Sequence, residues 1–70
     1  MNPIDQIKKG IDAACVKQRM SIIEASDRAG IAPSTMYRFI SGGDIRLTTL
    51  ALFFSKGLGL KFETVLRMGK

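Results

Sequence analysis

The chain has 70 residues, of which 46% are hydrophobic, and its 11 Lys and Arg against 6 Asp and Glu give a net charge of +5. This composition fits one small globular domain and excludes a disordered tail, and the positive charge favours a polyanion as partner. No apolar run approaches the roughly 20 residues that span a bilayer, so no membrane partner is expected.

Few side chains in this sequence can support catalysis or metal binding. The chain has no His, and Cys15 is its one cysteine, so neither an internal disulfide nor a zinc site built from Cys and His is expected. The serines lack an imidazole that would act as their general base. We therefore expect a protein that is not an enzyme and that uses no metal, cofactor or small-molecule ligand. A single cysteine also fits a reducing, cytoplasmic setting.

Residues 3–17 carry the signals of a first helix. Asn2 is a favourable N-cap, Pro3 suits the first helical position, and Asp5 complements the helix dipole. Apolar residues recur there at steps of three and four and form the predicted buried stripe, namely Ile4, Ile7, Ile11 and Cys15. Gly10 lies within this helix and permits the close approach of a neighbour.

The next segment predicts two short helices joined by a tight turn. Ser21 and Glu24 form the pattern of a capping box at the start of the first helix. Gly30 can adopt the left-handed conformation that ends this helix. Pro33 suits the first position of the second helix, where a missing N–H is not needed. The predicted helices cover residues 22–29 and 33–41.

The second of these helices has two different faces. Its apolar positions follow helical spacing and predict a core-facing side of Met36, Phe39 and Ile40. The opposite side carries hydroxyl, phenol and guanidinium groups, from Ser34, Thr35, Tyr37, Arg38 and Ser41. Arginine can bind guanine O6 and N7 as a bidentate fork, and hydroxyl groups reach base edges or phosphates. This face suits the major groove of DNA, and it equally suits an ordinary solvated helix face.

The C-terminal part predicts two further helices. After a loop over residues 42–47, Thr48 is the expected N-cap of a helix that Gly57 and Gly59 end. Its predicted core residues are Leu47, Leu50, Phe53, Phe54 and Leu58. Because this helix is apolar on nearly all sides, we expect it to be central or to meet a partner subunit. Residues 60–68 show both helical and alternating apolar spacing, and a helix is favoured over a strand.

This order of elements resembles a known family. The matching positions are Ala25, Ser26, Gly30, Ile31, Met36, Phe39 and Gly42. With the capped helix before them, they resemble the helix-turn-helix of the Cro/CI phage-repressor family, the lambda-repressor-like or XRE-type DNA-binding domains. The resemblance implies a compact all-α fold of five helices over residues 1–70, a single domain whose second and third helices form the helix-turn-helix. The chain departs from the family at Ile22, often Gln, and at Ala32, often Ser or Thr.

The resemblance also implies which residues contact DNA. Base edges would be read by Pro33, Ser34, Tyr37 and Arg38. Phosphates would be contacted by Lys17, Arg19, Ser21, Thr35, Ser41 and Arg46. Of these, Arg46 is the favoured phosphate clamp, because the loop after the recognition helix follows the DNA backbone in the family. Arg28 is expected instead to pair with Glu24 on its own helix.

We therefore expect a sequence-specific transcriptional regulator that binds double-stranded DNA, a Cro-like phage or prokaryotic repressor of a palindromic operator. One short helix reads few base pairs, so a homodimer on half-sites about 34 Å apart is expected. Candidates for the dimer contact are Phe62, Val65, Leu66 and Met68, with Leu52 or Phe53. Core packing within one subunit is an equally good interpretation of Phe62 and Val65. The alternative function is a protein-interaction module, such as an antitoxin-like partner with the same fold.

Overall fold

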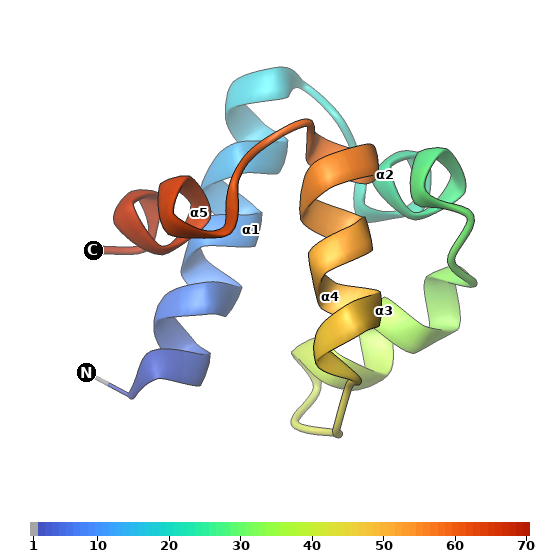
Figure 1. Ribbon diagram of the computed structural model, residues 1–70, viewed down its shortest axis with the longest axis horizontal. Coiled ribbons are helices and arrows are strands. Elements are labelled where there is room, and N and C mark those ends of the chain that lie inside the picture. Colours follow the sequence, from blue (N-terminus) through green and yellow to red (C-terminus); the bar gives the residue numbers. More distant parts are fainter. Residues whose placement is uncertain (1) are drawn as a thin grey trace.

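The computed structural model describes residues 2–70, and every regular element in this range is a helix. The elements are α1 (Pro3–Gln18), α2 (Ile22–Ala29), α3 (Pro33–Ile40), α4 (Leu47–Leu52), η1 (Phe53–Leu58) and α5 (Phe62–Met68). The packed pair of α1 and α5 lies on the side of the molecule that carries both chain termini, and α2 and α3 lie on the other side (Figure 1). The predicted all-helical architecture is therefore confirmed for this range. None of these helices is long and apolar enough to cross a membrane.

Local signals set the starts of α1 and α2 and the end of α2 as predicted. The Asn2 side chain accepts a hydrogen bond from the Ile4 N–H at 2.8 Å and caps α1. The Ser21 hydroxyl accepts from the Glu24 N–H at 3.1 Å, and the Glu24 carboxylate accepts from the Ser21 N–H at 3.4 Å. Both halves of the capping box are therefore present at α2. Gly30 follows α2 with a left-handed φ of 73°.

One core joins the helices. Its buried apolar residues are Ile11, Ala14, Cys15, Met20, Ala25, Met36, Phe39, Leu50, Phe53, Phe54, Leu58 and Val65. Cys15 is thus a core residue, and burial, together with the nearby Asp12 carboxylate, raises the pKa of its thiol. The thiol therefore stays protonated at neutral pH and acts as a small apolar group.

Three apolar residues that were predicted to face the core are exposed instead. Ile4 is 50% exposed, Ile40 36% and Leu47 71%. All three lie at helix ends, in the first turns of α1 and α4 and at the last residue of α3. Helical spacing determines the side on which a residue lies, but in so small a domain the neighbouring helices do not extend far enough to cover every helix end. These three predictions were wrong for that reason.

The helix after the loop starts and ends differently from the prediction. Arg46 precedes its first residue, Leu47, so Thr48 lies inside α4 and does not cap it. The chain then continues without interruption into η1, a π-helical segment that was not predicted. Gly57 is buried within η1, and Gly59, with a φ of 68°, follows its last residue.

Gly57 lies within η1 and does not end it. Its role is to allow close packing against α2. A Cβ built on Gly57 would lie 2.6 Å from the carbonyl oxygen of Ala25 in α2, closer than side chains approach. The missing side chain therefore lets η1 lie directly against the backbone of α2, which is the supporting helix of the α2–α3 pair.

The last segment forms a helix, so the favoured interpretation of residues 60–68 is confirmed. α5 docks on α1 through two glycines. A Cβ on Gly10 would overlap the carbonyl oxygen of Val65, and a Cβ on Gly69 would overlap that of Gln6. The Gln6 side-chain amide also donates to the Leu66 carbonyl at 2.7 Å. The predicted close approach of a neighbour at Gly10 is therefore confirmed, and this neighbour is α5.

Ser26 in α2 is buried without a partner for its hydroxyl, and its replacement gives a first test. The side chain is 0% exposed, and its Oγ has no hydrogen bond among residues 2–70. We expect Ser26→Ala to raise the free energy of unfolding by about 1 kcal/mol, because it removes an unsatisfied buried group and improves helix propensity. Urea denaturation monitored by circular dichroism measures this change. Ser55→Ala, at an exposed helical position, is the control and should change stability by about 0.5 kcal/mol or less. A loss of stability in Ser26→Ala would show that the hydroxyl is satisfied.

Candidate nucleic-acid interface

The connection between α2 and α3 is short and well held. Beyond α2, the Gly30 N–H donates to the Asp27 carbonyl at 3.2 Å and the Ile31 N–H donates to the Ser26 carbonyl at 2.9 Å. Ile31 packs against the core, and Pro33 starts α3 soon afterwards. The turn therefore sets α3 at a defined angle to α2, with which it is in contact.

The back of α3 is anchored in the core. Met36 is 0% exposed and Phe39 is 4% exposed. The Lys8 ammonium of α1 lies 5.7 Å from the centroid of the Phe39 ring, within the range of a cation–π contact. Burial of these two large side chains holds α3 by one face and leaves its other face to solvent.

The front of α3 carries the side chains that were predicted to read bases. Ser34, Tyr37 and Arg38 are exposed, Tyr37 by 46%, and Pro33 is half-buried at the start of the helix. The outward position of Tyr37 and Arg38 is therefore confirmed. A guanidinium, a phenol and a hydroxyl on one short helix offer several hydrogen-bond donors to a polar surface.

The predicted phosphate contacts fall into two groups. Thr35, Ser41 and Arg46 lie on α3 or in the loop that follows it, and this loop lies at the same end of the view as α3 (Figure 1). Ser41 and Arg46 are exposed and Thr35 is half-buried. A duplex that met the exposed face of α3 would therefore have these three residues near its edges.

The second group lies elsewhere. Lys17 and Arg19 are exposed at the C-terminal end of α1, which is at the top of Figure 1, away from α3. Ser21 is exposed, but its hydroxyl already accepts the capping hydrogen bond of α2. A ligand bound to α3 would contact these three residues only if it also extended past the start of α2.

One residue of this region was missed by the sequence analysis. The sequence analysis placed Gly42 and Gly43 in the loop after the predicted helix 33–41 and gave a role only to Gly42, as a position that matches the family. A Cβ built on Gly43 would lie 2.7 Å from Cγ of Arg38 and 2.9 Å from the Arg38 carbonyl oxygen. The paired glycines were a signal in the sequence, but this contact is visible only in three dimensions.

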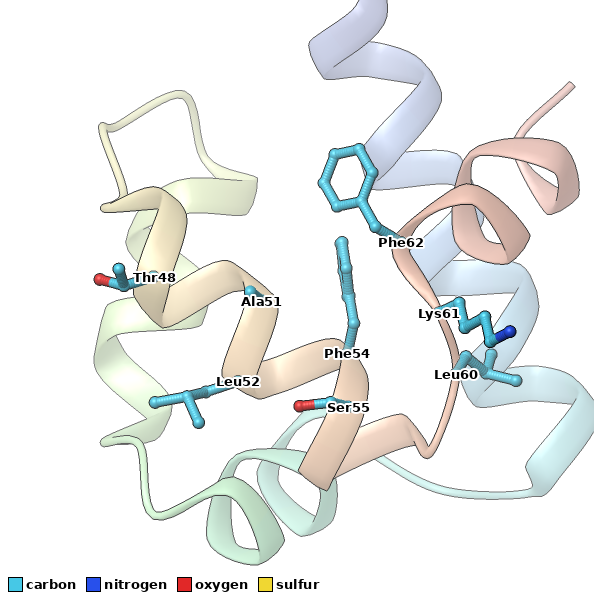
Figure 2. Close-up of a pocket in the computed structure, with 8 residues that line it drawn as sticks. All are labelled: Thr48, Ala51, Leu52, Phe54, Ser55, Leu60, Lys61 and Phe62. Atoms are coloured by element: carbon cyan, nitrogen blue, oxygen red, sulfur yellow. The ribbon is translucent and has the colours of Figure 1, made fainter.

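A second surface lies between α4, η1 and α5. It is an open hollow of about 540 Å³ lined by Thr48, Ala51, Leu52, Phe54, Ser55, Leu60, Lys61 and Phe62. Phe54 and Phe62 pack against each other on its α5 side, with ring centroids 5.3 Å apart and ring planes tilted by 51°, and Leu52 projects from α4 away from these rings (Figure 2). Leu52 is 41% exposed and Phe62 is 37% exposed. We call this surface the α4–α5 hollow.

The hollow changes the set of candidate dimer residues. Val65 and Phe53 are both 0% exposed, so both belong to the core of one chain, which is the alternative that the sequence analysis gave for Val65 and the core position that it predicted for Phe53. Met68 is half-buried against the same core, and Leu66 is half-buried. The large apolar side chains that remain exposed among the candidates are Leu52 and Phe62, and both line the hollow.

Comparison of the chain with models of known protein families, with curated proteins and with solved structures gave no match.

Proposed function

We propose that this chain is a sequence-specific regulator of transcription that inserts α3 into the major groove of duplex DNA, with α2 and α3 as a lambda-repressor-like helix-turn-helix. The observation that carries the proposal is the division of α3 into two faces. Met36 and Phe39 hold the helix from behind, and Tyr37 and Arg38 are left in solvent. A helix held in this way can enter a groove about 12 Å wide without unfolding.

Charge supports a polyanionic partner for the same surface. The chain has a net charge of +5, and Arg38 and Arg46 lie on α3 and just before α4. Neutralising phosphates releases counterions from DNA, so each such contact makes the affinity depend on salt. Asp44 is also exposed in the loop, and its negative charge limits how closely that part of the loop can approach a phosphate.

Selection of bound sequences from random duplexes is the direct test. We expect enrichment of a palindromic site, followed by tight binding of that site in fluorescence anisotropy at two salt concentrations. A scrambled duplex should bind more weakly, typically by 10³-fold or more for specific regulators. Equal affinity for both duplexes would show that the chain binds DNA only non-specifically, through its positive charge, and would refute the proposal.

Two copies of the chain are needed to read a palindrome, and we propose that they meet through the α4–α5 hollow. Of its lining residues, only Lys61 carries a charge. The other seven lining residues are uncharged, so association through this surface brings little of the +5 charge of each chain together. On a two-fold axis the same patch meets itself, so Leu52 and Phe62 of each copy would fill the hollow of the other.

A charge placed in the hollow tests this contact. We expect Leu52→Glu to leave the single chain folded, because Leu52 is 41% exposed, but to set like charges against each other across the two-fold axis. Analytical ultracentrifugation with the selected duplex should find two protomers per site for the unmodified chain and one for the variant. Val16→Glu is the matched control, since Val16 is 71% exposed on α1 and outside the hollow. Two protomers per site with Leu52→Glu would remove the hollow from the contact.

The same hollow supports a second candidate function, a protein-interaction module that docks a helix of another protein. The favouring observation is the exposure of Leu52 and Phe62 on one continuous surface. The anisotropy measurement separates the two functions. A module of this kind would show no preference for any duplex, and its weak binding would disappear at the higher salt concentration.

A further inference from the structure

Three helices of this chain end with the same backbone hydrogen bond. Met20 after α1, Ile31 after α2 and Gly43 after α3 each donate to the carbonyl five residues earlier, at 2.9, 2.9 and 2.8 Å. This is the long bond of a Schellman motif, in which the chain turns back over the helix that it has just left. The residue before each donor is left-handed or has a positive φ, and these residues are Arg19, Gly30 and Gly42.

The end of α3 differs from the other two in what covers it. Met20 and Ile31 pack against the core, which is the apolar contact that usually accompanies the motif. Gly43 has no side chain to make that contact. A Cβ at this position would lie 2.7 Å from Cγ of Arg38, so the aliphatic stem of Arg38 occupies the space directly above the turn. A side chain at position 43 would therefore meet both the stem of Arg38 and, at 2.9 Å, the carbonyl oxygen to which the Gly43 N–H donates.

We propose that Gly43 is a positioning residue for Arg38, and that its missing side chain lets the Arg38 stem lie against the turn, which limits the directions in which the guanidinium can point before DNA is bound. The role in specificity rests on the proposed function. An arginine whose stem is already held loses less rotamer freedom when it binds a base. The binding free energy therefore improves only for DNA sites that suit the conformation in which the arginine is held.

Gly43→Ala is the test, with Gly42→Ala as its matched control. Gly42 has a φ of 107°, and a Cβ there would have nothing within 4 Å, so its substitution strains the same turn without touching Arg38. The first measurement is ¹⁵N relaxation of the Arg38 Nε–H in the free protein. The second is the ratio of affinities for the selected duplex and for a scrambled duplex. We expect Gly43→Ala to make the Nε–H more mobile and to lower the ratio by roughly 3- to 10-fold. Gly42→Ala should change neither quantity.

The double variant decides whether Gly43 acts through Arg38. In an Arg38→Ala background, Gly43→Ala should leave the affinity ratio unchanged. A fall of equal size in both backgrounds would show a general effect on the fold and would overturn the proposal, as would an unchanged mobility of the Arg38 Nε–H. If the unmodified chain prefers no duplex, the proposed function and the specificity role fail together. The relaxation measurement still reports whether Gly43 holds Arg38, so the two failures are told apart.

Discussion

Replacing Arg38 with alanine is expected to weaken binding to the selected DNA site by about 1–3 kcal/mol, roughly 5- to 150-fold, and to change binding to scrambled DNA far less. Arg38 is exposed on the helix whose back, at Met36 and Phe39, is buried. A bidentate contact with guanine is lost completely when the guanidinium is removed. Titrations of both duplexes by fluorescence anisotropy measure the two losses. Equal losses would make Arg38 a phosphate contact.

Arg46→Ala provides the contrasting variant for that experiment. Arg46 lies in the loop after α3 and immediately before α4, where a phosphate contact is expected. Its removal should weaken both duplexes alike and lower the slope of log affinity against log salt by about one. The pair of variants therefore separates base reading from charge neutralisation within one short segment. An unchanged slope would take Arg46 out of the interface.

Replacing Gly10 with alanine is expected to lower the free energy of unfolding by about 2 kcal/mol, although alanine favours a helix by about 1 kcal/mol over glycine. A Cβ on Gly10 would overlap the Val65 carbonyl oxygen, and the Cγ1 of Val65 would lie 2.8 Å away. The obstacle includes the backbone of α5, so the whole of α5 must move. Thermal unfolding should shift downwards by on the order of 10 °C in a domain of this size.

Lys9→Ala is the matched control, because Lys9 is the exposed neighbour of Gly10 on α1. Its effect should stay within about 0.5 kcal/mol, as for most surface substitutions. A Gly10→Ala variant that is more stable than the unmodified chain would mean that α5 does not dock on α1 in this way. Val65 would then need another explanation for its complete burial.

The sequence by itself determined where most helices begin and end. Asn2, Ser21, Gly30 and Pro33 act on the backbone within a few residues of themselves, through caps, a left-handed turn and a restricted φ. Such signals need no partner from a distant part of the chain, so they can be recognised from residues that are close in the sequence. The outward face of α3 was predictable for a related reason, because Met36 and Phe39 are large enough to be buried in almost any packing of that helix.

Only the tertiary structure decided which apolar residues are covered and what each glycine does. Ile4, Ile40 and Leu47 have the spacing of core residues but are exposed, because neighbouring elements only partly cover the helix ends on which they lie. Gly10 and Gly57 are both glycines within helical segments, yet Gly10 meets the Val65 carbonyl of α5 and Gly57 meets the Ala25 carbonyl of α2. Contacts between residues far apart in the chain depend on how the helices cross. That crossing is set by the sum of all packing contacts rather than by any local signal.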